Sequence, residues 1–213
     1  MDALSDEHIV TTALQLIRRD GAERLSMRKL AKELGVTPMA IYYYLPNKDA
    51  LFGRLADEVL GRVPRPAPSG SAWRNELHAY AVGAWQMLRE YPGLSAHIIR
   101  LVPGAQSEAL TAYGVSILVA AGLDAATASL AINSYHAFLI GVVEQEAQLA
   151  RMPRRKRKGG PTSSYLQQLD FRELVDFGVE ALLNGLSERL RSQRRLRPAR
   201  TRVSKSRPAP KYA

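Results

Sequence analysis

The feature that most constrains the fold is a pair of very short helical patterns joined by an even shorter turn. The first begins at Ser26, a preferred N-cap, and the second at Thr37-Pro38, where threonine caps well and proline has no amide hydrogen to lose. Helices joined this closely must cross at short range, which requires a small residue at their contact and a glycine in the turn. Ala31 and Gly35 meet both needs, so the pattern predicts a helix-turn-helix.

Two longer helical patterns flank this motif. The pattern before it begins after Ser5 and ends at Gly21, with an apolar face formed by Ile9, Ala13, Leu16 and Ile17. The pattern after it follows Asn47, another preferred cap, and covers about residues 47–62. The residues up to 50 therefore predict a small helical domain, and the helix over 47–62 is expected to connect it to the rest of the chain.

The remainder of the chain is predicted to be helical as well. A cluster of prolines, glycine and serines over 64–71 reads as a loop, and no alternating strand pattern competes beyond it. The expected helices cover roughly 72–91, 93–102, 105–121, 124–151 and 170–192. We therefore expect an all-α protein with a helix-turn-helix domain over 1–50, a helical bundle domain over 51–191 and a basic, disordered tail over 192–213.

The net charge of +10 is concentrated in two segments. Residues 151–158 hold six basic residues and 191–213 hold nine, with no acid in either, so the rest of the chain carries −5. Such blocks attract DNA non-specifically, but a solvated loop is the favoured interpretation of 151–158. The global charge is therefore weak evidence for where DNA would bind.

The gross composition excludes several classes of protein. The absence of cysteine removes disulfides, thiolate nucleophiles and sulfur-ligated metal sites, and the acidic N-terminus does not resemble a secretory signal. Residues 125–143 carry no charge over the length of a minimal membrane span, but interspersed polar residues favour a helix at a core or dimer interface. A cytoplasmic location is expected.

The motif resembles a known family. The run from Leu30 to Leu51 (LAKELGVTPMAIYYYLPNKDAL) is similar to the tetracycline-repressor (TetR) family of regulators, most tellingly in its Leu-Gly-Val turn, its three tyrosines and the segment after Pro46. The resemblance is strong over about residues 6–60. It implies an all-helical dimer whose N-terminal domains bind an operator and whose C-terminal domains meet in a four-helix interface.

The resemblance also implies which residues bind DNA. Base or flanking backbone contacts fall on Thr37, Pro38, Met39, Ala40, Tyr42 and Tyr43, and phosphate contacts fall on Lys48 and Arg28. Tyrosine hydroxyls and Lys48 suit phosphates, whereas Met39 and Ala40 suit thymine methyl groups. Ile41 is expected to anchor the recognition helix in the core, and Tyr44 is expected to pack inward.

A ligand site is implied by the family and by no residue cluster. Apolar walls with few polar groups are typical of such sites, and the candidates are Trp85, His97, Tyr113, Asn133, Tyr135, His136 and Phe138. For any single one of them, a core or interface position is the favoured alternative. Four scattered histidines without cysteine give no metal signature, and no cofactor is expected.

Dimerisation is expected through helices 124–151 and 170–192, because an apolar face on each would otherwise remain exposed. Small residues that would permit close approach are Ala128, Ala131, Gly141, Gly178 and Gly185. A dimer places two recognition helices about one DNA turn apart, so the operator should be near-palindromic.

Together these patterns predict a sequence-specific DNA-binding transcriptional regulator, a repressor released from its operator by a small molecule. No phosphate loop, dinucleotide fingerprint or nucleophile elbow supports an enzyme. The alternatives are an architectural, non-specific DNA-binding protein that uses its basic tail, a ligand-independent regulator, and a helical enzyme or ligand carrier.

Overall fold

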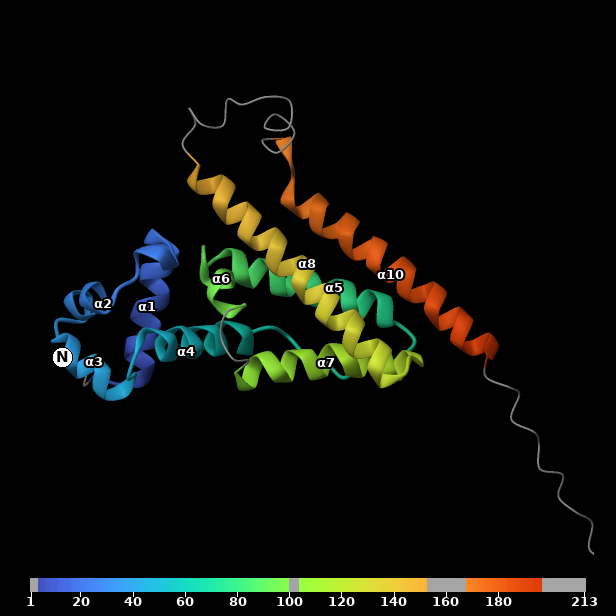
Figure 1. Ribbon diagram of the computed structural model, residues 1–213, viewed down its shortest axis with the longest axis horizontal. Helices are drawn as coiled ribbons and strands as arrows, with labels where there is room; N and C mark the ends of the chain where they lie inside the picture. The colour runs from blue at the N-terminus through green and yellow to red at the C-terminus, as the bar shows by residue number, and fades with distance from the viewer. Residues whose placement is uncertain (1–3, 100–103, 153–167, 197–213) are drawn as a thin grey trace, which may run out of the picture.

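A computed structural model describes residues 4–99, 104–152 and 168–196. Within these residues every regular element is helical, which confirms the all-α prediction (Figure 1). The elements are α1 (Asp6–Asp20), the short 3-10 helix η1 (Ala22–Arg24), α2 (Met27–Leu34), α3 (Pro38–Tyr44), α4 (Lys48–Gly61), α5 (Trp73–Arg89), α6 (Leu94–Ile98), α7 (Ala105–Ala121), α8 (Ala125–Arg151) and α10 (Phe171–Leu196).

The first four α-helices begin at the caps that the sequence predicts. At Ser5, Ser26, Thr37 and Asn47 the side-chain oxygen accepts a hydrogen bond from the backbone N–H three residues on. The turn between α2 and α3 also has the expected form, because Gly35 adopts the left-handed conformation with φ of 68°. Local chemistry therefore sets the bounds of the helix-turn-helix.

The recognition helix α3 is anchored in the core of this region by one side chain. Ile41 of α3 is fully buried beside Leu30 and Ala31 of α2, as expected. Arg54 of α4 donates to Asp6 of α1 at 2.8 Å, which ties the start of the connecting helix to the same unit. The orientation of α3 thus depends on its packing against α2, and α4 is held to the same unit through α1.

The C-terminal helices form a bundle around α8. Figure 1 shows α4 leaving the helix-turn-helix and running beneath α5 and α6, while α8 crosses α5 and α7 and lies alongside α10 at the outer edge. α8 is long and apolar enough to cross a membrane, but it packs against α5, α6, α7 and α10. These contacts place one face of residues 125–143 in the core, which is one of the two positions expected for this helix.

Contacts outside α4 also join the DNA-binding helices to the C-terminal bundle. The backbone N–H of Ala22 donates to the carbonyl of Pro92 at 2.9 Å, and Arg151 at the end of α8 pairs with Glu23 at 2.8 Å. Arg18 of α1 pairs with Glu90 as well. The turn between α1 and α2 therefore rests on the C-terminal bundle.

The structure corrects two boundaries and adds one short element. The helix expected over 93–102 is the five-residue α6, and residues 100–103 lie outside the described part of the chain. The tail expected to be unfolded from residue 192 begins as helix, because α10 continues to Leu196, and the Gln193 side chain donates to Asp124 at 2.6 Å. η1 has no counterpart in the sequence prediction, because one turn is too short to show periodicity.

The predicted basic segments lie largely outside the described residues, which omit 153–167 and 197–213. The predicted division into 1–50 and 51–191 stays a prediction. α4 contacts α1 on one side and α5, α6 and α7 on the other, so it belongs to both parts.

Candidate nucleic-acid interface and ligand cavity

Helix α3 exposes the side chains that the sequence assigns to DNA. Because Ile41 faces the core, Met39 and Tyr43 project into solvent with 74% and 85% of their surface exposed, and Tyr42 is exposed by 39%. α3 lies at the end of the molecule opposite the C-terminal bundle (Figure 1). The recognition helix thus presents an apolar edge and two phenol groups.

The other residues of the predicted reading surface are placed at the start of α3. The Thr37 hydroxyl accepts the backbone N–H of Ala40 at 3.4 Å and keeps its own hydrogen available for a phosphate. Pro38 and Ala40 are half-buried. Their small side chains leave the backbone of the first turn close to the surface.

Charge on this side of the molecule is partly neutralised. Lys29 donates to Asp20 at 2.7 Å, and this hydrogen bond holds the pKa of that carboxyl below its usual range. Lys48 and Arg28 are both exposed, and the ammonium of Lys48 lies 5.4 Å from the centre of the Phe52 ring. Lys48 also stands at the positive end of α4, which favours a phosphate beside it.

The expectation that Tyr44 packs inward is wrong, because 39% of the residue is exposed, as much as for Tyr42. Its hydroxyl donates to the carbonyl of Leu4 at 2.7 Å, and its ring packs edge-on against Tyr43. Tyr44 therefore holds Leu4 against α3 at the surface.

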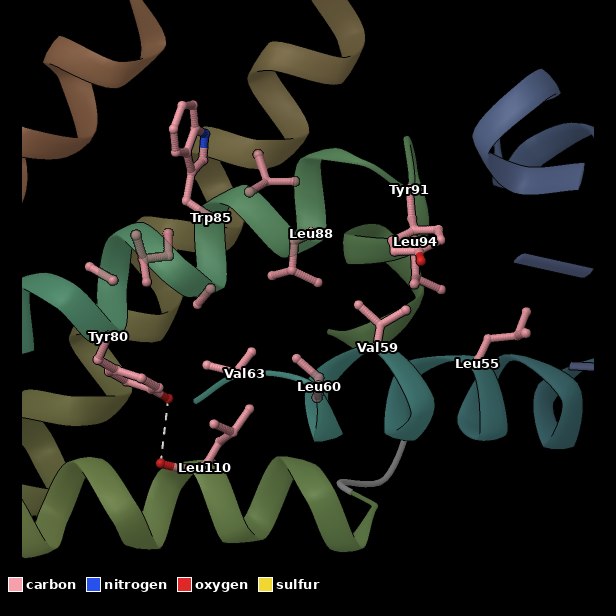
Figure 2. Close-up of a cluster of buried hydrophobic side chains, with 14 of the residues drawn as sticks. Leu55, Val59, Leu60, Val63, Tyr80, Trp85, Leu88, Tyr91, Leu94 and Leu110 are labelled. Atoms are coloured by element: carbon pink, nitrogen blue, oxygen red, sulfur yellow. Dashed lines mark hydrogen bonds between the residues drawn. The ribbon is translucent and has the colours of Figure 1, made fainter. Parts of the chain in front are cut away.

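A cavity of about 60 Å³ lies in the C-terminal bundle. Five helices contribute to its wall: α4, α5, α6, α7 and α8. Figure 2 shows Leu60 of α4, Leu88 of α5 and Leu110 of α7 directed into the same buried region, with Tyr80 reaching toward α7. The full lining is Leu60, Tyr80, Ala84, Leu88, Ile98, Ser107, Leu110, His136, Leu139 and Ile140.

The polar part of the cavity centres on one pair. The Tyr80 hydroxyl oxygen lies 2.7 Å from His136 Nε2 and 3.4 Å from the carbonyl oxygen of Leu110. Burial raises the pKa of the Tyr80 phenol and lowers the pKa of His136. Both groups are therefore uncharged near neutral pH.

Only part of the predicted ligand set comes together here. His136 lines the cavity, Asn133 lines an adjoining open groove of about 820 Å³, and Tyr113 packs edge-on against the Tyr80 ring with 5.6 Å between centroids. Sequence reasoning missed Tyr80, because an apolar helix face shows which residues are buried without showing which of them border a cavity.

Other predicted ligand residues have structural partners elsewhere. Trp85 donates to Glu146 at 3.1 Å, and Figure 2 shows its ring on the opposite side of α5 from Leu88. The His97 ring stacks on Phe52 of α4 with 3.7 Å between centroids. These positions are the core alternatives that the sequence left open.

Tyr135 and Phe138 also serve the packing of the bundle. The Tyr135 hydroxyl donates to the carbonyl of Leu77, and the Phe138 ring lies where a side chain on Gly178 would be. Among the described residues, no three histidine, aspartate or glutamate side chains gather in a way that would hold a metal ion.

A polar contact, the α4–α7 clasp of Asp57, Gly61, Arg65 and Gln106, joins the connecting helix to the cavity wall. The Asp57 carboxylate accepts the backbone N–H of Gln106 at 3.2 Å, and Arg65 donates to the Gln106 side chain at 3.0 Å. The Gln106 side chain also lies against the bare backbone of Gly61. The next residue, Ser107, lines the cavity.

The comparisons with known proteins cover most of the chain. Residues 9–55 match the family model of bacterial regulatory proteins, tetR family. An HTH-type transcriptional regulator of Saccharopolyspora erythraea is 30% identical over 174 residues, which cover 80% of this chain and 71% of that protein. Tetracycline repressor protein class C of Escherichia coli is 32% identical over 154 residues, 70% of each chain.

A solved structure shares the fold over nearly the same extent. The TetR family protein ActR of Streptomyces coelicolor, in complex with actinorhodin, has a TM-score of 0.74 at 22% identity and covers 89% of this chain and 99% of its own. Sequence similarity and fold thus agree beyond the helix-turn-helix. The chain belongs to the tetR family of bacterial regulatory proteins.

Proposed function

We propose that this family member is a homodimeric repressor that binds a near-palindromic operator through α3 and is released when a small molecule occupies the cavity of the C-terminal bundle. The observation that carries the proposal is that one helix, α4, extends from the DNA-binding face to the cavity. α4 presents Lys48 beside the exposed face of α3 and Leu60 to the cavity.

The DNA side of the proposal rests on exposure and chemistry. Met39 and Ala40 offer apolar surface to thymine methyl groups in the major groove, while Tyr42 and Tyr43 offer hydroxyls to phosphates. Lys48 adds a positive charge at a helix start, where a phosphate is favoured. Contacts of both kinds are needed, because phosphates position a protein and base edges give it specificity.

A second copy is proposed to cover the outer face of α8 and α10. Leu130 of α8 and Phe177 of α10 expose 72% and 76% of their surface, and large apolar groups exposed to water favour association with another surface. No non-local atom lies within 4 Å of a side chain built on Gly185, so this position is open to another chain, whereas the equally open Gly141 borders the groove between α7 and α8. Ala128 and Gly178, by contrast, are occupied by contacts within the protomer.

The cavity is proposed to act on DNA binding through α4 and the α4–α7 clasp. A ligand that displaces the Ser107 side chain moves the first turn of α7, and Gln106 passes this movement to Asp57. Because α4 also packs on α1, its displacement changes the distance between the two recognition helices of a dimer. The ligand must bind the released state more tightly than the operator-bound state. The regulator would work in the cytoplasm.

Selection of random duplexes by the purified full-length protein tests the proposal. We expect a near-palindromic site to be enriched, and we expect Tyr42→Ala and Lys48→Ala to lose that enrichment. Arg191→Ala is the matched control, because it removes an exposed cation on α10, away from α3. Uniform, salt-sensitive binding without an enriched site would contradict the proposal and favour an architectural protein that uses its basic tail.

A further inference from the structure

We infer that the cavity takes an uncharged, mainly apolar small molecule that carries a hydroxyl or N–H group at its buried end. The inference names the ligand class of the site proposed above, so it rests on the proposed function for its biological meaning. Its physical basis is the composition of the cavity wall and the geometry of the Tyr80–His136 pair.

The wall is apolar on almost every side. Its members include Leu60, Leu88, Leu110, Leu139 and Ile140, and none of the ten lining residues is an aspartate, glutamate, lysine or arginine. Moving a carboxylate or an ammonium group from water into such surroundings is costly without an opposite charge to pair with it. The wall therefore selects against both anions and cations.

One end of the cavity offers a hydrogen-bond acceptor. The Tyr80 hydroxyl has a single hydrogen, which goes either to His136 Nε2 or, when His136 itself donates, to the Leu110 carbonyl. In both arrangements the Tyr80 oxygen keeps a lone pair. A ligand hydroxyl or N–H can donate to that lone pair without breaking the existing contact.

Both members of the pair are neutral in this environment. Tyr80 has 4% of its surface exposed, and burial raises the pKa of its phenol and lowers the pKa of His136. Neither group therefore supplies a charge that would compensate a charged ligand. This supports the conclusion drawn from the wall.

The size of the cavity suggests how the molecule enters. Its volume of about 60 Å³ accommodates only the end of a ligand, but four of its residues, Ile98, Ser107, His136 and Ile140, also line the groove of about 820 Å³ between α7 and α8. The two spaces therefore adjoin at these four side chains. A ligand whose polar end lies at Tyr80 can extend past Ser107 and His136, with its remaining apolar part in the groove.

The groove carries a single carboxylate. Glu108 is exposed at its edge, and the other lining residues apart from His136 are apolar, small or neutral polar side chains. A charge in contact with water acts weakly on a ligand held in the cavity. Glu108 nevertheless makes a positively charged probe the stricter test, so the experiment includes one.

Three probes with the same naphthalene ring separate charge from shape. 1-Naphthalenemethanol is neutral with one hydroxyl, 1-naphthoate is an anion, and 1-naphthylmethylammonium is a cation. Isothermal titration of the full-length protein should show one alcohol bound per protomer, at least tenfold more tightly than either charged probe.

Variants locate the binding site. Ala84 lines the cavity and Ala79 is exposed on the same helix, so Ala84→Leu should weaken binding of the alcohol at least tenfold, whereas Ala79→Leu should leave it unchanged. Tyr80→Phe keeps the ring and removes the hydroxyl, and should weaken binding about fivefold, as expected for one neutral hydrogen bond. Circular dichroism melting curves check that each variant is folded.

Several outcomes would overturn the inference. The first is that the alcohol does not bind up to its solubility limit. The second is that folded Ala84→Leu still binds the alcohol. The third is that a charged probe binds as tightly as the alcohol and that Ala84→Leu abolishes this binding. Selection of an operator by a protein that does not bind the alcohol would remove the inference and leave the regulator proposal intact. A protein that binds the alcohol in the cavity but selects no duplex would contradict the regulator proposal and leave the inferred ligand class intact.

Discussion

The helices of the DNA-binding region and most of those around the cavity begin in different ways. α1, α2, α3 and α4 each carry a side-chain cap on the residue just before the helix, and so does α8, where Asp124 accepts the backbone N–H of Thr127. α5, α6 and α7 begin after Ala72, Gly93 and Gly104, which supply no side-chain cap. α7 is capped instead by Asp57, 49 positions earlier on α4. The starts of the first four helices are thus specified by neighbours in the chain, whereas the start of α7 depends on a neighbour in space.

The difference has a functional meaning. In the proposed function, the DNA-binding helices must keep their shape while they are displaced. Local caps serve this need, because each of them stabilises its helix independently of the rest of the molecule. In the same proposal, the helices around the cavity must change their packing when a ligand binds. Because the start of α7 is held by Asp57, its displacement is passed to α4. The following substitutions test this contrast, from the largest expected effect to the smallest.

Ile41→Ala should lower the free energy of unfolding by about 3 kcal/mol, because it removes three carbon atoms from a fully buried position. The matched control is Met39→Ala, which alters an exposed residue on the same helix and should change stability by less than about 0.5 kcal/mol while weakening operator binding. Urea denaturation of the full-length chain measures both. Equal losses of stability would refute the assignment of Ile41 as anchor and Met39 as reader.

Gly178→Ala should lower the free energy of unfolding by about 1 to 3 kcal/mol, because the new methyl group meets the Phe138 ring. Gly83→Ala, within α5 and with open space around it, should raise it by about 0.5 to 1 kcal/mol through helix propensity. Thermal unfolding of both variants gives the comparison. A loss at Gly83 as large as the loss at Gly178 would contradict the assignment of the latter to the Phe138 ring.

Ser26→Ala and Asp57→Ala should each lower the free energy of unfolding by about 1 kcal/mol, the usual value of a lost helix cap. Their local effects should differ. Hydrogen exchange should accelerate at the Lys29 amide in the first variant, and at the Gln106 amide together with neighbouring amides of α4 in the second. Faster exchange confined to α7 in Asp57→Ala would break the proposed coupling of α7 to α4.

Asp124 gives the smallest effect, which appears as a dependence on pH. The backbone N–H of Thr127 and the side chain of Gln193 donate to its carboxylate and lower its pKa to about 2. Because the pKa is lower in the folded state, the carboxylate stabilises the protein above its unfolded pKa, and this contribution is lost as the pH falls toward 2. Asp124→Asn should flatten the decline of stability between about pH 4 and 2. An unchanged acid limb in the variant would contradict this assignment.

The extent of correct prediction follows the same division. Caps, turn and core anchor of the helix-turn-helix were predicted from residues at most six positions apart, and the structure confirms them. Met39, Tyr42 and Tyr43 were assigned to the exposed face for the same reason. In the cavity, only His136 was anticipated, because the wall combines five helices whose crossing angles depend on every side chain between them.

The sequence by itself determined that this chain is helical, where most of its helices begin and which face of α3 meets solvent. These properties depend on hydrogen bonds and periodicity within a few residues, where neighbours in sequence are also neighbours in space. The tertiary structure alone decided that Trp85 and His97 belong to the core, that Tyr80 pairs with His136, and that Asp57 caps a helix formed much later in the chain. Such contacts join residues 45 or more positions apart and exist only when several helices have packed together.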